Sequence, residues 1–247
     1  MQNNAAVRLY ELTRRLRSAS RNGSPARLWA QALGIPINPE VAGLPIVPVV
    51  HGITAYLDLL EETETGIREL GFDGFYSEAF PPLRQIVYVS LSNLQGRQSN
   101  LTRPITDKTL TLLQVIAAEW GKKKPDPEID DKVLKEIQAE ANDLFEAVKR
   151  AEFDGDLKRL ILSLTSEIQQ AMQQYRIGGR EGLKRALALI IGQAKLNSES
   201  IYKADARTRI WWTRFCNVAV KLSEVVKFAT DARKTIDAIS SLVRFDK

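Results

Sequence analysis

The chain has 247 residues, of which 44% are hydrophobic and 26% are charged, so it can bury a core and is too apolar to be disordered throughout. Its single cysteine, Cys216, excludes an intramolecular disulfide and a cysteine metal cluster. The net charge of +5 is unevenly placed, because residues 1–33 and residues 201–247 each carry a net +5 and the stretch between them sums to −5.

The N-terminal part of the chain predicts helices that prolines interrupt. Apolar spacing predicts a first helix over about 4–17. Ser24 is placed to cap a second helix that opens with a proline and that Gly34 ends. The Pro-rich connector 35–48 has four prolines, which remove amide donors and disfavour helix. A third helix is expected over about 49–70.

The secondary structure of residues 83–94 is left open between helix and strand. Residues 83–94 suit a short strand by residue preference and a helix equally well, since a strand would have no partner here. Thr106 and Asp107 then open a helix that we expect to end at Trp120. The charged, proline-punctuated linker 122–127 follows and is the predicted domain boundary, because no proline occurs after it.

Long helices are expected beyond the linker. We expect helices over 128–153 and 156–176, the second capped by Asp154 or Asp156. A Gly-Gly turn then leads into a short helix over 180–196. Together with the segments before the linker, these elements predict an all-α fold.

The C-terminal end carries the most regular apolar pattern. No glycine or proline occurs from 193 to 247, so we expect one long helix or two joined by a tight polar turn. Apolar residues spaced alternately by three and four predict a buried helix seam like that of a coiled coil. The seam residues are Phe215, Val218, Leu222, Val225, Ala229, Ala232, Ile236, Ile239 and Val243.

The predicted architecture therefore has two domains. The N-terminal helical part spans 1–121 and contains the proline-rich connector. The C-terminal part spans 128–247 and is a helical bundle with long antiparallel helices.

One segment resembles a known kind of protein. An acidic, leucine-rich helix precedes a helix that ends in Gln-Tyr-Arg-Ile, and Gly-Gly-Arg-Glu-Gly-Leu at 178–183 leads into a short apolar helix. Over about 143–197 this pattern is similar to an uncharacterised bacterial family of helical proteins. The resemblance implies a bacterial source and no chemistry, so it supplies no functional residue.

Residues for bond-making chemistry are scarce. His51 is the only histidine, and with Cys216 it offers too few nitrogen and sulfur ligands for zinc. We read His51 as a packed or surface residue. Gly178-Gly179 is a turn rather than a phosphate loop, and Asp154-Gly155-Asp156 lacks the later ligands of a calcium loop. We therefore identify no catalytic residue, metal site, cofactor or small-molecule substrate.

Arginine and tryptophan are combined near the start of the last long segment. This mixture is typical of hot spots in protein interfaces, of single-stranded nucleic-acid binding and of membrane headgroup zones. The alternative is that Trp212 and Phe215 enter the core and the arginines are solvated. The candidate binding residues are Arg207, Arg209, Trp211, Trp212 and Arg214.

The uneven charge has two explanations. The basic ends can fold onto the acidic middle, which is most acidic over 51–80, or they can bind nucleic acid or an anionic membrane surface. We favour the first explanation. No apolar run is long enough to span a membrane and no signal peptide is recognised, so we expect a soluble, cytoplasmic protein.

The sequence favours a non-enzymatic interaction or regulatory protein that works through helix–helix contacts, as an oligomer or as a subunit of a larger assembly. A nucleic-acid or anionic-membrane-surface binder that uses the basic ends is the first alternative. An enzyme whose site is assembled from scattered Asp, Glu and Arg is the second.

Overall fold

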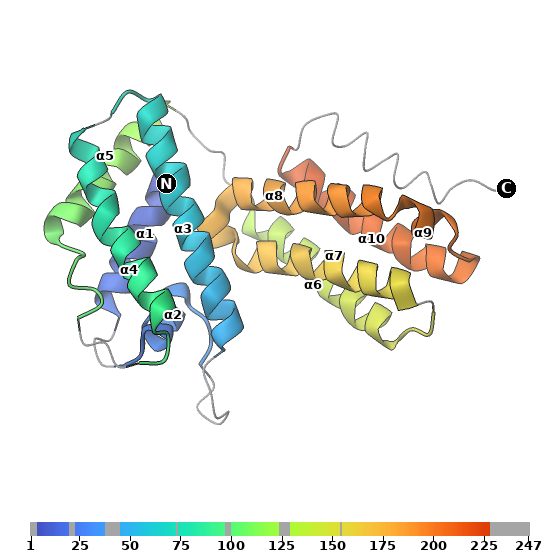
Figure 1. Cartoon of the computed structure of the whole chain (residues 1–247). Helices are drawn as coiled ribbons and strands as arrows, with labels where there is room; N and C mark the ends of the chain where they lie inside the picture. Colours follow the sequence, from blue (N-terminus) through green and yellow to red (C-terminus); the bar gives the residue numbers. More distant parts are fainter. Residues whose placement is uncertain are drawn as a thin grey trace. The chain divides into compact units, whose positions relative to one another are not determined.

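The computed structural model describes residues 4–19, 23–37, 45–72, 74–96, 100–123, 129–153 and 155–227, and within these ranges every regular element is a helix. The predicted all-α fold is confirmed. The chain divides into two compact units (Figure 1). Unit 1 comprises residues 1–128 with Arg176–Gly179, and unit 2 comprises Ile129–Tyr175 with Arg180–Lys247.

Unit 1 is built from five α-helices and one short 3-10 helix, among its described residues. Helix α1 packs against α2, α3 and α5, and α3 also packs against α4. Their bounds are α1 Ala5–Ser18, α2 Pro25–Leu33, α3 Ile46–Glu69, η1 Phe75–Ala79, α4 Phe80–Ser92 and α5 Asp107–Lys123.

Polar caps explain where three of these helices begin. The side chain of Asn4 accepts a hydrogen bond from the Val7 amide at the start of α1, 2.9 Å away. Ser24 accepts one from the Arg27 amide at the start of α2, and Gly34 ends that helix in the left-handed region, both as predicted. Thr106 caps α5 through the Thr109 amide.

Two segments differ from their predicted form. Helix α3 begins at Ile46 rather than near 49 and contains Pro48, because a proline is tolerated in the first turn, where its missing amide has no helical partner. Residues 83–94, left open between helix and strand, lie mostly in α4, whose first turn accommodates Pro81 and Pro82. Residues 38–44 of the connector lie outside the described part of the chain.

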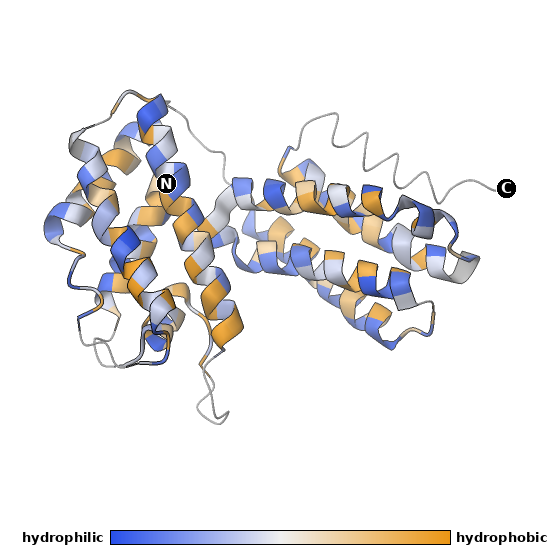
Figure 2. Ribbon diagram, in the orientation of Figure 1, coloured by the Kyte–Doolittle hydropathy of each residue, from blue (hydrophilic) through white to orange (hydrophobic). Residues whose placement is uncertain are grey.

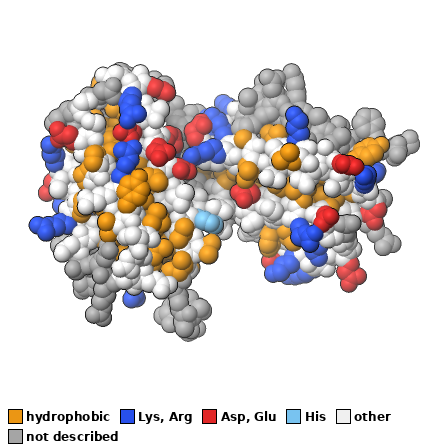
Figure 3. All heavy atoms as spheres, in the orientation of Figure 1, with side chains coloured by type: hydrophobic (Ala, Val, Ile, Leu, Met, Phe, Trp, Pro, Cys, Tyr) orange, Lys and Arg blue, Asp and Glu red, His pale blue; other side chains and the backbone are white. Residues whose placement is uncertain are grey.

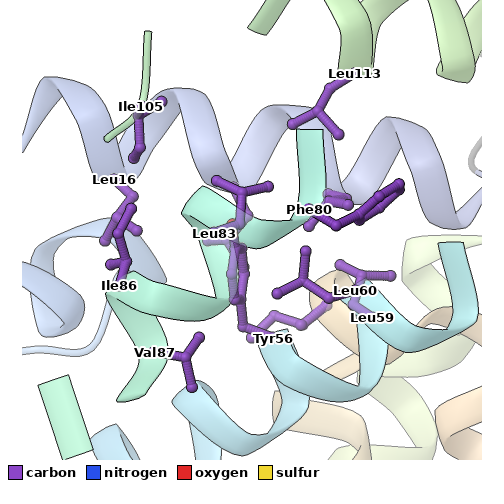
Figure 4. Packing of buried hydrophobic residues seen from close by; sticks show 14 of the residues in the cluster. Leu16, Tyr56, Leu59, Leu60, Phe80, Leu83, Ile86, Val87, Ile105 and Leu113 are labelled. Carbon is purple, nitrogen blue, oxygen red and sulfur yellow. The ribbon is translucent and has the colours of Figure 1, made fainter. Parts of the chain in front are cut away.

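The helices are amphipathic, and their apolar sides form the core of each unit. Figure 2 shows hydrophobic and hydrophilic stretches alternating along them, and Figure 3 shows lysine, arginine and acidic side chains spread over the surface. In unit 1, large buried side chains from α1, α3, α4 and α5 converge (Figure 4). Tyr56, Phe80 and Leu83 are fully buried there.

The described residues of unit 2 form four long helices and one short one. Helix α6 packs against α7 and α10, and α10 also packs against α7. Their bounds are α6 Asp131–Arg150, α7 Gly155–Gln173, α8 Tyr175–Leu196, α9 Ser198–Tyr202 and α10 Ala206–Val225. Helices α6, α7, α8 and α10 contribute to one hydrophobic core, with Trp212 and Phe215 among its largest members.

Of the two forms expected for residues 193–247, the single long helix is not what the described residues 193–227 form. The chain between 193 and 227 forms the end of α8, the short α9 and then α10. The Asn197 side chain donates to the Gln193 carbonyl, 2.8 Å away, where α8 ends. The Asp205 carboxylate accepts from the Thr208 amide, 2.8 Å away, and so caps α10. These polar residues interrupt the helix without a glycine or a proline.

Two smaller predictions concern unit 2. Of the two caps proposed for α7, Asp156 lies inside the first turn, and Asp154 lies outside the described residues and stays a prediction. The turn at the glycine pair is confined to Gly179, whose φ of 55° and ψ of −152° break α8.

The predicted linker is partly helical, because α5 continues to Lys123. Residues 124–128 lie outside the described ranges, and the division between units falls at 128–129. Arg176–Gly179, which lies within the predicted domain 128–247, groups with unit 1.

Candidate interaction surfaces

The arginine and tryptophan residues of α10 differ in burial and in the contacts that they make. Trp212 is completely buried and packs against Phe215, with ring centroids 5.2 Å apart. It therefore belongs to the core of unit 2. Arg209 donates from Nε to the Ala204 carbonyl, 2.8 Å away, and from Nη2 to the Tyr202 carbonyl, 3.3 Å away. These bonds secure the turn between α9 and α10. The side chain of Arg207 lies outside the described part.

Trp211 and Arg214 lie at the surface of unit 2. The Trp211 ring is half-buried and nearly parallel to that of Phe153, at 9° with centroids 6.3 Å apart. The Arg214 guanidinium lies 5.1 Å from the centre of the Trp211 ring, and the Lys158 ammonium lies 6.0 Å from that of Phe153. Both distances are within the range of cation–π attraction. Phe153 and Lys158 carried no sequence signal that linked them to Trp211.

The predicted seam begins in α10. Phe215, Val218 and Leu222 are buried, and Val225 is half-buried at the end of the helix. The remaining seam residues lie outside the described part of the chain, namely Ala229, Ala232, Ile236, Ile239 and Val243.

A groove runs beside this seam between α6 and α10, and we call it the α6–α10 groove. Its volume is about 490 Å³, and its lining includes apolar Leu144 and Val218. Its charged residues are Glu140 and Asp143 on α6 and Arg214 and Lys221 on α10. The ammonium of Lys221 lies 2.5 Å from the Glu140 carboxylate. Asn217 and Val220 complete the lining.

The N-terminal arginines are engaged within unit 1. The Arg8 side chain is buried, donates from Nε to the Ile177 carbonyl at 2.9 Å, and lies 3.5 Å from the Glu62 carboxylate. Arg14 pairs with Glu11 at 2.7 Å and Arg17 with Asp107 at 2.6 Å.

One of these contacts joins the basic N-terminal end to the acidic middle, because Glu62 lies within 51–80. Arg17 also perturbs its partner. Its hydrogen bond and positive charge hold the pKa of the Asp107 carboxyl below its ordinary value. These arginines therefore take part in the fold.

A buried polar pair lies in the core of unit 1. The hydroxyl groups of Tyr56 and Thr13 are 2.8 Å apart and hydrogen-bonded. Burial raises the pKa of Tyr56 well above its ordinary value of 10.0. The pair is enclosed by packing, which indicates a structural role.

Helices α3 and α4 pack against each other, and both carry exposed apolar side chains. Val47 on α3 is 64% exposed, and Tyr88 and Leu91 on α4 are 61% and 41% exposed. Half-buried Val50 and Leu57 lie on the same helix as Val47. Figure 3 shows hydrophobic side chains gathered over these two helices. We call these five residues the α3–α4 face.

The edge of the α3–α4 face carries one carboxylate between two guanidinium groups. Glu64 of α3 accepts hydrogen bonds from Arg68, 2.9 Å away, and from Arg84 of α4. The sequence did not predict this face, because α4 is apolar on nearly every side and its pattern does not say which side is exposed. Unit 2 exposes a further group of large apolar residues, Leu189, Leu196, Tyr202 and Ile210.

The titratable residues named from the sequence belong to different units. His51 is half-exposed on α3, and Cys216 is buried on α10. Among the described residues, no three histidine, cysteine or acidic side chains are grouped so that they could hold a metal ion.

None of the described helices is both long enough and apolar enough to cross a lipid bilayer.

Comparisons of the chain with protein-family models, curated proteins and solved structures give no match. The resemblance over 143–197 stays a prediction.

Proposed function

We propose that this chain is a non-enzymatic helical protein of a bacterial cytoplasm that acts through protein–protein contacts, and that its α3–α4 face binds a second copy of the chain. The observation that carries the proposal is the exposure of Val47, Tyr88 and Leu91 on two adjacent helices. Contiguous apolar surface on a folded protein is typical of an interaction site. Two such faces would pack as helix against helix and bury these side chains.

The five residues of the face carry no charge, which favours a second copy as its partner. In a two-fold interface the same patch meets itself, so an unbalanced charge would face its own like. Arg68 and Arg84 both pair with Glu64, so the excess positive charge of these three side chains lies at the edge of the face and not among its apolar residues. Tyr88 supplies the aromatic side chain that is common at interface centres.

A double variant tests this proposal. Tyr88→Glu with Leu91→Glu places four carboxylates in the two-fold interface, and both side chains are exposed, so the fold of one chain should be retained. Light scattering after size exclusion should give the mass of two chains for the wild type and of one chain for the variant. Val115→Glu is the control, because Val115 is also exposed but lies on α5. It should keep the mass of two chains. A wild type of single-chain mass at high concentration would overturn the proposal.

A group of cationic and aromatic side chains at the surface of unit 2 favours a second candidate function. Lys158, Phe153, Trp211 and Arg214 place two cations beside two aromatic rings. This combination suits a single-stranded nucleic acid, whose phosphates and bases such groups contact. Binding of a labelled oligonucleotide should then weaken steeply with salt and should be lost in Arg214→Glu. The absence of binding at low salt would remove this candidate.

A further inference from the structure

The part of α8 that follows its break is apolar on two opposite sides. The side that faces the core of unit 2 carries Leu183, Leu187 and Ile190, all of them buried. Residues seven positions apart lie within about 20° of each other around a helix, so they share one side. Leu189 and Leu196 are related in this way, and they lie on the side away from the core, 45% and 81% exposed. A surface helix normally presents polar residues on that side.

We call this side of the helix the outward side of α8. Two leucines and two small residues make it apolar, and both of its charged residues are basic. A Cβ at Gly192 would meet nothing within 4 Å, so no described part of the chain covers that position. The outward side consists of the exposed residues Arg185, Ala188, Leu189, Gly192, Lys195 and Leu196.

Exposed apolar side chains continue beyond the end of α8. The short helix α9 follows directly and carries Tyr202, which is 61% exposed (Figure 1). Its neighbour Ile201 is completely buried and so holds α9 on the core of unit 2. Tyrosine combines an apolar ring with a polar hydroxyl, and it is enriched where a membrane meets water.

The outward side and α9 lie in a positively charged stretch. Residues 181–203 carry four basic and two acidic side chains, a net +2. Both acids already pair with lysines, since Glu181 lies 2.6 Å from Lys184 and Glu199 lies 2.5 Å from Lys203. A second copy of the chain that met this side would bring positive charge against positive charge. An anionic surface would instead be attracted to it.

We propose that the outward side of α8, together with Tyr202, binds the surface of an anionic lipid bilayer. The helix lies in the plane of the headgroups, and Leu189, Leu196 and Tyr202 enter the boundary of the acyl chains. Arg185 and Lys195 meet the lipid phosphates. This surface is different from the α3–α4 face, so the inference goes beyond the proposed pairing of two copies and is independent of it.

Flotation of the full-length chain with vesicles tests the proposal. The wild type should bind vesicles of equal parts phosphatidylglycerol and phosphatidylcholine, and it should bind pure phosphatidylcholine vesicles at least about tenfold more weakly. Leu189→Glu with Leu196→Glu should lower the affinity for the mixed vesicles by at least about tenfold, and so should Lys195→Glu. All three side chains are exposed, so these variants should keep the wild-type circular dichroism. Val115→Glu, at an exposed position on α5 of unit 1, should bind as the wild type does.

A gain of affinity distinguishes a bilayer from a partner protein. Gly192→Leu adds an apolar side chain to the outward side, where it has room. It should raise the affinity for the mixed vesicles by about tenfold, because one more leucine enters the acyl boundary. A partner helix that packed closely over the small residues would instead be held away by this leucine.

Four results would overturn the proposal. The first is no binding of the wild type to the mixed vesicles, and the second is equal binding to both kinds of vesicle. The third is weaker vesicle binding by Gly192→Leu. The fourth is binding that Tyr88→Glu/Leu91→Glu abolishes and Leu189→Glu/Leu196→Glu does not, because the α3–α4 face would then be the part that contacts the bilayer.

Discussion

Arg8 and Ile177 are 169 positions apart in the chain, and the Nε of Arg8 donates a hydrogen bond of 2.9 Å to the Ile177 carbonyl. The same guanidinium lies 3.5 Å from Glu62 and is almost completely buried. Arg8 therefore attaches the start of α8 to α1 within unit 1, by a contact that neither helix could make from local sequence alone.

Loss of this contact should destabilise unit 1. Arg8→Met keeps the aliphatic length and removes the donors, so the Ile177 carbonyl loses a buried partner. We expect a decrease of about 1–3 kcal/mol in the free energy of unfolding, measured by urea titration. Arg14→Met is the matched control, because Arg14 is exposed and its pair with Glu11 should contribute less than about 1 kcal/mol. Equal effects of the two variants would contradict a special role for Arg8.

Gly179 is the second component of this attachment. Its φ of 55° and ψ of −152° are accessible almost only to glycine, and a Cβ there would lie 2.3 Å from Cζ of Arg8. Gly179→Ala should lower the melting temperature, with a loss of at least about 1–3 kcal/mol. Gly178→Ala is the control, because a Cβ there meets nothing within 4 Å.

The effects of substitutions at Arg8 and at Gly179 on stability should also be coupled. In an Arg8→Ala background the side chain that clashes is gone, so Gly179→Ala should cost less than it does in the wild type. Strict additivity of the two changes would show that backbone strain alone accounts for the Gly179 effect.

A second glycine depends on close packing rather than on backbone conformation. A Cβ on Gly66 of α3 would lie 2.0 Å from the ring of Trp120 on α5. Gly66→Ala should destabilise the protein by about 1–3 kcal/mol, the usual result of overpacking a core, although alanine favours helix. Gly192→Ala on α8, where a Cβ meets nothing within 4 Å, should instead be neutral or stabilising. Thermal melts of both variants would check the contrast.

The buried phenol of Tyr56 should make the protein sensitive to alkali. Burial raises the pKa of Tyr56 above the value of 10.0 that it has when unfolded, so the unfolded chain loses a proton that the folded chain keeps. This contribution is fully present below pH 10 and decreases as pH rises further, by up to about 1.4 kcal/mol per pH unit.

Replacement of the hydroxyl pair tests this effect. Tyr56→Phe with Thr13→Val removes both hydrogen-bond partners and should flatten the decline of unfolding free energy above pH 10. Tyr202→Phe, at an exposed tyrosine of α9, should leave the decline as in the wild type. If the double variant declines as steeply as the wild type, other groups cause the alkaline loss.

Local signals in the sequence were sufficient for several elements. Ser24 and Gly34 define α2 because a side-chain cap and a left-handed C-terminal glycine act within one turn of the helix. The helix predicted to end at 196 agrees with α8, and a polar turn was one of the two forms expected beyond it. The position of that turn was not predicted, because no glycine or proline marks it. Asp205 is nevertheless a recognisable N-cap.

The candidate surfaces depend on contacts that sequence spacing does not contain. Trp211 and Trp212 are neighbours, and only the packing of α10 decides that one is half-buried beside Phe153 and the other is in the core. Sequence spacing does not show the α3–α4 face either. Val47 on α3 and Leu91 on α4 are 44 positions apart in the sequence, and only the structure shows that these two helices pack together.

The central claim is that the α3–α4 face joins two copies of the chain, and sedimentation velocity over a wide range of concentrations tests it most directly. The wild type should sediment as two chains at high concentration and shift to one chain on dilution. The Tyr88→Glu/Leu91→Glu variant should sediment as one folded chain throughout. A wild type that sediments as one chain at every concentration, or a double variant that still pairs, would contradict the claim.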